Sequence, residues 1–379
     1  MINYIKQDET HYSWVMRNHG YDKSGNYCIK KCSIDDLENG LAAYFGVKHA
    51  ILTTSATMGL TLALKAVNAE NKVVAVPSFT FIASAFAATC IGSEIKFVDV
   101  NTNNICSELG DFVSGTKMPD VIMAVHIGGA SCNMDELVNF CKANGIPLIE
   151  DAAQAIGSMY KGRKLGALGD IGVVSFGRSK LVTGGEGGAI LTNHDNIAEY
   201  LRALINFGVF NNSDPYKHNI TGFNGKISEI QASLIMSQLP TIDTLAERRH
   251  ANQNLLKNKL GTIRSFVAVE PLWNELCNCY MFMIRYIPKK NNQISRDKLC
   301  MKFRENGLPV AASEKFPYPI YKNPCYGINE RLCPTSEMIY QEIITIGHPS
   351  SSSLFNLEQS LVEVIADKII AIAKKEGVE

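Results

Sequence analysis

Short runs of apolar residues alternate with helical periodicity through the first half of the chain, and this alternation permits few folds. The runs expected to be strands are 50–52, 72–76, 95–98, 120–126, 146–150, 171–176 and 189–191. Strands that are apolar along their whole length are typical of parallel sheets whose two faces are both covered by helices. We therefore expect an α/β fold with a mainly parallel, mixed sheet flanked by helices.

The helical pattern that follows residue 226 breaks at Pro240. We place a domain boundary there, because proline interrupts the hydrogen bonding of a helix. Residues 1–240 are expected to form the large domain, with an irregular N-terminal arm over 1–32. Residues 241–379 contain both strand-like and helical segments and are expected to form a smaller α+β domain.

The composition argues against several function classes. The chain of 379 residues carries 37 basic and 37 acidic residues and no basic stripe, so we expect no nucleic-acid partner. No apolar run approaches the length of about 18 residues that a transmembrane helix needs, so we expect no membrane partner. The first residues lack the apolar segment of a secretory signal, which favours a cytoplasmic protein. The 11 cysteines lack zinc-like spacing, so we expect reduced, mostly buried thiols and no metal.

One of the apolar runs, 171–176, leads to Lys180 in a turn that is dense in glycine. Lysine is a poor residue for filling a core, but its amine forms Schiff bases with carbonyl compounds once it has lost its proton. Burial favours that loss because it destabilises the charged form. An exposed lysine in a hairpin loop is an equally good interpretation of this stretch alone.

Other residues with chemical potential lie where they would meet this lysine. Ligands of parallel sheets gather at the carboxyl ends of the strands. Phe81, Asp151 and Lys180 all lie just beyond such ends, and Ala56 and Thr57 begin a helix whose free N–H groups suit a phosphate. Each feature alone has a commoner explanation in core packing or capping. Together they match pyridoxal 5'-phosphate (PLP), which needs a lysine for its aldehyde, a carboxylate for its ring nitrogen, an aromatic neighbour and a phosphate site.

Several longer motifs surround these residues. They are Ser55-Ala-Thr57, Pro77-Ser-Phe-Thr-Phe81, Phe97-Val-Asp99-Val, His126-Ile-Gly-Gly, Glu150-Asp-Ala-Ala-Gln154-Ala, the lysine stretch and Gly222-Phe-Asn224. In these motifs the chain resembles the DegT/DnrJ/EryC1/StrS family of PLP-dependent sugar aminotransferases, from Leu37 to Leu239 and more weakly to the end. The resemblance implies the fold type I aminotransferase architecture and a homodimer with shared active sites.

The resemblance also implies a role for each residue that matches a family motif. Lys180 would form the Schiff base with PLP and would be the base that moves the proton in the reaction. Asp151 would pair with the pyridine nitrogen, Gln154 would hydrogen-bond the ring hydroxyl, and Phe81 would stack on the ring. Lys180 and Asp151 are the residues expected to be catalytic.

The phosphate of PLP would be held by a second group of residues at matching positions. The amides of Ala56 and Thr57 would bind it together with Ser175. Asn224 would reach the phosphate of the neighbouring subunit, so each active site of the expected homodimer would draw on both chains.

The implied reaction moves the amino group of L-glutamate to a keto sugar, typically a nucleotide-linked keto-deoxyhexose, in the synthesis of aminosugars and surface polysaccharides. Lysine at position 180 favours transamination, since some relatives that act as dehydratases carry a histidine there. The chain departs from the family pattern at Arg178, at Lys226 in place of a common arginine, and at Tyr321 in place of a frequent histidine. These differences leave a small phosphorylated ketone or a keto-cyclitol as alternative substrates, and a non-catalytic PLP-binding protein as a weaker alternative.

Overall fold

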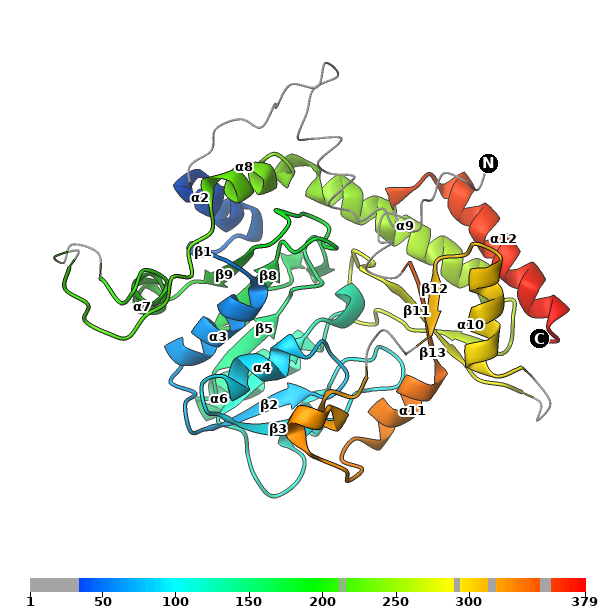
Figure 1. The fold of residues 1–379 in the computed structure, drawn as a ribbon, viewed down its shortest axis with the longest axis horizontal. Coiled ribbons are helices and arrows are strands. Elements are labelled where there is room, and N and C mark those ends of the chain that lie inside the picture. Colours follow the sequence, from blue (N-terminus) through cyan, green and yellow to red (C-terminus); the bar gives the residue numbers. More distant parts are fainter. Residues whose placement is uncertain (1–33, 211–213, 215, 290–293, 313–317, 348–355) are drawn as a thin grey trace, which may run out of the picture.

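The computed structural model describes residues 34–210, 214, 216–289, 294–312, 318–347 and 356–379 (Figure 1). The expected N-terminal arm over 1–32 lies outside these residues. The described chain contains a seven-stranded sheet, a four-stranded sheet and a two-stranded ribbon of β6 (Met159–Tyr160) and β7 (Arg163–Lys164). The larger sheet occupies the left and centre of Figure 1, and the smaller sheet lies to its right.

The seven-stranded sheet has the strand order β1-β9-β8-β5-β4-β2-β3. Its strands are β1 (His49–Thr53), β2 (Val73–Pro77), β3 (Glu94–Val98), β4 (Val121–Val125), β5 (Leu148–Asp151), β8 (Ile171–Ser175) and β9 (Gly188–Thr192). β9 is antiparallel to both of its neighbours, and the other strands run in one common direction. All strands expected in this half of the chain are present, so the prediction of a mainly parallel, mixed sheet is confirmed.

Helices cover both faces of this sheet, which explains why its strands are apolar throughout. Successive residues of β8 show the two faces, since Val173 packs in one apolar core and Val174 in the other. The core around Val173 includes residues of α3 (Ala56–Ala66), α4 (Ala83–Thr89) and α7 (Asp195–Ile205). The core around Val174 includes residues of α2 (Ile34–Phe45), α5 (Leu109–Val113), α6 (Met134–Asn144) and α8 (Glu229–Met236).

The C-terminal part of the chain builds the four-stranded antiparallel sheet β10-β11-β13-β12. Its strands are β10 (Phe266–Ala268), β11 (Phe282–Tyr286), β12 (Val310–Ala312) and β13 (Ile343–Ile346). Its helices are α9 (Ile242–Leu260), α10 (Arg296–Glu305), α11 (Pro334–Glu342) and α12 (Gln359–Lys375). A separate apolar core fills this part, with residues of α9, α10 and α12 against the sheet.

Helix α9 belongs to both parts of the molecule. Ile242 and Ala246 at its start pack in the core beneath the large sheet, whereas Leu256 and Leu260 at its end pack in the C-terminal core. The boundary proposed at Pro240 therefore precedes a helix that two cores share, and it stays a prediction.

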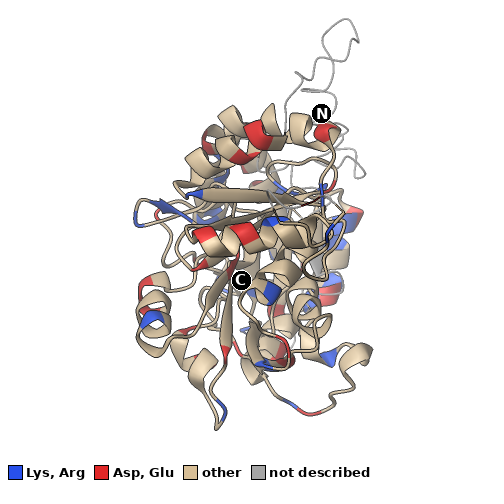
Figure 2. Ribbon diagram, turned by 90° about the vertical axis from the view of Figure 1, so that its left-hand side faces the viewer, with Lys and Arg blue, Asp and Glu red and all other residues tan. Residues whose placement is uncertain are grey.

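The surface of the described residues mixes charges of both signs along the helices, as Figure 2 shows. None of the described helices combines the length and the apolar character needed to cross a membrane. The nine cysteines in the described ranges are free thiols, of which only Cys90 and Cys325 are exposed. Within the same ranges no three potential ligands among His, Cys, Asp and Glu gather as a metal site.

Candidate active site

Three strand ends bring a serine hydroxyl next to the start of a helix. Thr53 of β1, Gly188 of β9 and Ser175 of β8 lie side by side in the register of the sheet. Gly188 has to be glycine here, because a Cβ at this position would lie 2.6 Å from the backbone nitrogen of Ala56. The carboxyl end of β8 and the first residue of α3 are therefore neighbours.

The start of α3 is built as an anion site. Ser55 caps the helix, and its hydroxyl accepts a hydrogen bond from the N–H of Met58 at 3.1 Å. The first N–H groups of any helix have no acceptor within it, so those of Ala56 and Thr57 are available to a phosphate. Ser175 accepts the N–H of Gly177 at 3.3 Å and keeps its own hydroxyl proton for another partner.

Asn224 lies in a segment that runs beside β1, the strand at one edge of the sheet. The segment that carries it is fixed to the end of β1, since the N–H of Thr54 donates to the carbonyl of Gly225 at 2.9 Å. Asn224 itself is exposed. The structure thus brings Ala56, Thr57 and Ser175 together and leaves Asn224 at the free edge beside β1.

Asp151 ends β5 as a buried carboxylate with defined partners. Its side chain is 6% exposed, so it has only a narrow opening toward a ligand. Oδ2 accepts the hydroxyl of Ser84 at 2.7 Å, and Oδ1 accepts the N–H of Ala153 at 3.1 Å. Each carboxylate oxygen can accept more than one hydrogen bond, which leaves room for a protonated ring nitrogen.

Gln154 and Phe81 lie near the same strand ends. The side-chain oxygen of Gln154 accepts the N–H of Gly128 at 2.7 Å, so its amide group remains as the donor for a ligand. Phe81 precedes α4 and is 57% exposed, so its ring is free to cover a ligand. Among the sequence-predicted site residues, it is the large apolar side chain left open.

Lys180 is half-buried in the turn between β8 and β9. Its Nζ lies 4.4 Å from the centre of the Tyr280 ring, and the Tyr280 hydroxyl is 2.8 Å from the hydroxyl of Ser179. Because β5 and β8 are paired parallel neighbours, Lys180 follows the strand next to the one that ends in Asp151. Tyr280 comes from the segment before β11 and was missed by the sequence interpretation, since nothing local marks it.

A buried pair supports the end of β5. Nε2 of His126 lies 3.0 Å from Oε2 of Glu150, and both side chains are fully buried. Burial raises the pKa of Glu150, but the hydrogen bond and charge of His126, together with backbone N–H groups, lower that pKa by more, so it lies below its ordinary value. The N–H of His126 also donates to the carbonyl of Asp151 at 3.1 Å. His126 thus acts as a support for the site.

The three residues that depart from the family pattern have different surroundings. Tyr321 is buried, and its hydroxyl hydrogen-bonds to Glu337, so it is already engaged within the fold. Lys226 lies over the ring of Phe207 and 3.3 Å from the side-chain oxygen of Asn206. Arg178 is exposed beside Lys180.

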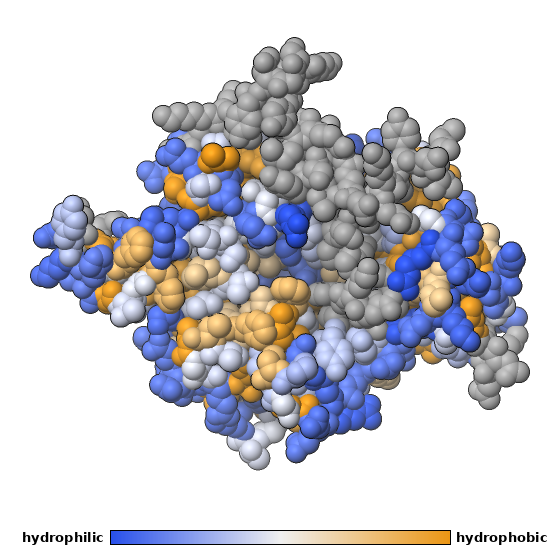
Figure 3. All heavy atoms as spheres, in the orientation of Figure 1, coloured by the Kyte–Doolittle hydropathy of each residue, from blue (hydrophilic) through white to orange (hydrophobic). Residues whose placement is uncertain are grey.

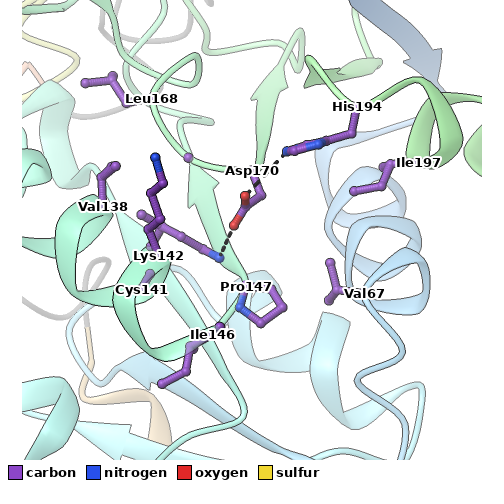
Figure 4. Close-up of a pocket in the computed structure, with 13 residues that line it drawn as sticks. Val67, Val138, Cys141, Lys142, Ile146, Pro147, Leu168, Asp170, His194 and Ile197 are labelled. Carbon is purple, nitrogen blue, oxygen red and sulfur yellow. Dashed lines mark hydrogen bonds and ion pairs between the residues drawn. The ribbon is translucent and has the colours of Figure 1, made fainter.

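A cavity of about 560 Å³ lies elsewhere, at the amino end of the sheet (Figure 4). Asp170 points into it between His194, 3.5 Å away, and the N–H of Leu148, 2.8 Å away at the start of β5. None of the residues predicted from the sequence lines this cavity, so it lies apart from the candidate active site.

The residues at the carboxyl edge fit PLP. The close approach that Gly188 permits forms a cradle between α3 and β8 for a phosphate, and Asp151 retains acceptor capacity toward a ring nitrogen. Such an edge, with a half-buried lysine in the turn that follows the next strand, is typical of the class of fold type I PLP-dependent aminotransferases.

The chain belongs to the DegT/DnrJ/EryC1/StrS aminotransferase family, whose model matches residues 9–364. The predictions of this family, of its fold class and of PLP as its cofactor are thereby confirmed.

Relatives from three bacteria give the family match more detail. The chain is 35% identical to UDP-4-amino-4,6-dideoxy-N-acetyl-beta-L-altrosamine transaminase of Campylobacter jejuni over 57% of this chain and 58% of that protein. It is 39% identical to GDP-perosamine synthase of Caulobacter vibrioides over 61% and 62%. These two alignments therefore span less than two thirds of either relative. The match to 3-amino-5-hydroxybenzoate synthase of Amycolatopsis mediterranei is 30% identical and covers 89% of both chains.

A solved structure shows the same fold. The crystal structure of 3-amino-5-hydroxybenzoic acid synthase superposes with a TM-score of 0.82 at 28% identity, covering 90% of this chain and 91% of that one. The aligned part of the chain is longer than the part that forms the large sheet and its helices. The agreement therefore extends into the part that forms the smaller sheet.

Proposed function

We propose that the protein is a PLP-dependent aminotransferase that moves the amino group of L-glutamate to a nucleotide-linked keto sugar in aminosugar and surface polysaccharide synthesis. One observation carries the chemistry: a half-buried Lys180 follows β8, and a buried, doubly hydrogen-bonded Asp151 ends the adjacent parallel strand β5. The sugar substrate is supported by the relatives named as a UDP-aminosugar transaminase and a GDP-perosamine synthase.

The chain's residues divide the work of transamination among them. When bound, PLP supplies an aldehyde and a protonated pyridine ring that takes up electrons from the reacting carbon. Lys180 would bond the aldehyde through Nζ and, once freed, would use the same atom to move the proton from the amino-acid carbon to the coenzyme. Asp151 keeps the ring nitrogen protonated. Asp151 is largely closed to water, which strengthens its electrostatic effect.

The remaining predicted residues bind and orient the coenzyme. The N–H groups of Ala56 and Thr57 and the hydroxyl of Ser175 hold the phosphate at the helix start. The amide nitrogen of Gln154 donates to the ring hydroxyl, and Phe81 covers one face of the ring. Each of these groups has unused hydrogen-bonding capacity or exposed area in the structure, which supports these roles.

A homodimer is part of the proposal. Phe81 and Phe86 are 57% and 38% exposed, and apolar residues gather over α3 and α4 in Figure 3. Asn224 is exposed at the free edge beside β1, in a position to serve a neighbouring subunit. These features support a shared active site, to which Asn224 of a second copy would contribute a phosphate contact. A cytoplasmic location suits the reduced thiols and remains a proposal.

A second substrate class is supported by one specific observation. The synthase of 3-amino-5-hydroxybenzoate, whose name describes an amino acid with a six-membered ring rather than a sugar, matches nearly the whole chain. Arg178 is exposed beside Lys180 and supplies a cation for an anionic substrate. A keto-cyclitol or a small phosphorylated ketone is therefore the alternative to the nucleotide-linked sugar.

The test begins with the colour of the purified protein after reconstitution with PLP. A lysine-bound pyridoxal absorbs visible light, and L-glutamate should bleach the band as it gives up its amino group. A panel of nucleotide-linked keto sugars, keto-cyclitols and phosphorylated ketones is then offered with nitrogen-15 glutamate, and the mass of the aminated product is measured. A protein that stays colourless with PLP contradicts the proposal, and a band that glutamate leaves unchanged favours the non-catalytic PLP-binding protein.

A further inference from the structure

Asp151 depends on a hydroxyl group that no family motif pointed to. Ser84, the second residue of α4, is 1% exposed, and its Oγ donates to Oδ2 of Asp151 at 2.7 Å. Behind it, Oγ1 of Thr80 lies 3.1 Å from Oγ of Ser84, and Thr80 is 3% exposed. Thr80, Ser84 and Asp151 thus form a buried line of oxygen atoms that leads to the candidate ring-nitrogen site.

The proton in each of these hydrogen bonds can be assigned by counting. A hydroxyl has one proton to donate, and Ser84 gives its proton to the carboxylate. The hydrogen bond between the two hydroxyls therefore requires Thr80 to be the donor and Ser84 the acceptor. Hydrogen bonds in such a chain polarise one another, so the bond to Asp151 is stronger than an isolated serine would make it.

The position of Ser84 is unusual for a serine in the first turn of a helix. Serine at a helix start commonly caps the backbone of its own helix. Here the hydroxyl crosses to a carboxylate 67 residues away in the sequence, and α4 has no side-chain cap. The hydroxyl of Ser84 therefore binds a residue of the candidate site and not the backbone of its own helix.

We propose that Ser84, supported by Thr80, is a positioning residue that fixes the Asp151 carboxylate and keeps the shared proton on the ring nitrogen of PLP. The proposal rests on the proposed function. A hydrogen bond to an ionised carboxylate favours that form over the protonated one. Ser84 therefore opposes transfer of the ring proton to Asp151, and it also prevents the carboxylate from rotating away from the ring. Without it, the ring takes up electrons less effectively.

The experiment compares wild type, Ser84→Ala, Ser84→Thr and Ser78→Ala, each loaded with PLP that carries nitrogen-15 in its ring. The Thr variant keeps the hydroxyl. The Ser78 variant removes a fully buried hydroxyl of the same size from the same segment, but its partner is Ser336 at 2.6 Å. The nitrogen resonance reports protonation of the ring independently of turnover, and kcat and KM for glutamate are measured alongside.

Ser84→Ala should move the nitrogen resonance toward the unprotonated value and lower kcat by about 10- to 100-fold, because a hydrogen bond to a charged group is lost. The KM for glutamate should stay within about twofold, since no glutamate contact is removed. Ser84→Thr should restore both readouts, and Ser78→Ala should match wild type. Thr80→Val should change both in the same direction but less, and it provides the test if Ser84→Ala fails to fold.

A wild-type resonance and kcat in Ser84→Ala, with only a lower unfolding midpoint, would overturn the proposal and leave Ser84 a structural role. An equal effect of Ser78→Ala would do the same, because it would show a general response to lost buried hydroxyls. If the wild-type protein transaminates and Ser84→Ala has the same nitrogen resonance and kcat, this inference alone is refuted. A wild-type protein that neither binds PLP nor transaminates refutes the proposed function and this inference together.

Discussion

The ring of Tyr280 lies against the amine of Lys180, and this contact bears on how the lysine meets a carbonyl compound. An aromatic face stabilises a nearby ammonium by about 0.5–2 kcal/mol. That is enough to hold the side chain in one place, but little compared with the bond that forms when the amine attacks an aldehyde. Tyr280 thus orients Nζ without trapping it, and its hydroxyl is fixed in turn by Ser179.

Replacing this lysine separates coenzyme binding from chemistry. Lys180→Ala should lower turnover by more than about 10³-fold, since the bond to the aldehyde and the proton transfer are both lost. PLP should still bind through the helix start and Ser175, although without the visible band of a lysine-bound pyridoxal. Absorption spectra, equilibrium dialysis with PLP and glutamate turnover measure the three effects. Lys161→Ala, which removes an exposed lysine paired with Asp135, is the control. A wild-type rate in Lys180→Ala would rule out the assignment.

At the scale of elements, a strand or helix can be predicted from the sequence when its residues form a pattern of sufficient length. The strands of the large sheet were predictable because burial on two faces leaves a continuous apolar run, as in β4 and β8. α5 has only five residues, too few for a periodic pattern that would predict it. The three-residue strands β10 and β12 were missed for the same reason.

The candidate site divides along a similar line. Asp151 and Ser175 end their strands, and Lys180 lies in the turn that follows. The ends of strands can be predicted from the sequence, so the meeting of these residues at one edge of the sheet could be inferred. Ser84 and Tyr280 reach the site through contacts across 67 and 100 residues of chain, which no local pattern records. Their roles appear only when the sheet and its helices are packed together.

Asp99 caps the start of a helix that lies far from it in the sequence. It follows β3, and its carboxylate accepts the N–H groups of Thr335 and Ser336, both at 2.8 Å, at the start of α11. Asp99→Ala should therefore cost about 1–2 kcal/mol in the free energy of unfolding, because it removes a helix cap and a favourable charge at the helix start. Asp99→Asn should cost less, since one acceptor oxygen remains.

Urea unfolding at neutral pH measures these changes. Asp297→Ala is the matched control, because Asp297 lies in the first turn of α10 and is exposed, with its neighbour Arg296 as partner. A loss in Asp297→Ala equal to that in Asp99→Ala would show that the effect belongs to helix starts in general and not to this contact between the two parts of the molecule.

At the scale of the whole molecule, one buried carboxylate connects the ends of the strands that carry the site. Glu150 pairs with His126 at the end of β4 and accepts backbone N–H groups from the loop that leads into β8, namely those of Gly166, Leu168 and Gly169. Because β5 lies between β4 and β8, this network fixes the spacing of all three strands. Acid should therefore affect folding and the site together.

The sign of that pH dependence follows from the lowered pKa of Glu150. Folding favours its ionised form, so the unfolded chain binds more protons wherever the pH lies between the folded pKa and the ordinary value of 4.5. The stabilisation is complete above that ordinary value and is lost as the pH falls through the folded pKa. Glu150→Gln should cost about 3 kcal/mol at pH 7, because it breaks a buried pair.

Glu150→Gln should also make the free energy of unfolding less dependent on pH below 4.5, since the group that titrates is gone. Urea unfolding of wild type and variant over a series of acidic buffers measures both the offset and the slope. Glu70→Gln is the control, because Glu70 is exposed and pairs with Lys65 at the surface, where an ion pair contributes little. An unchanged slope in Glu150→Gln would mean that other carboxylates govern acid unfolding. In that case the network around Glu150 aligns the three strands without setting the pH range in which the fold survives.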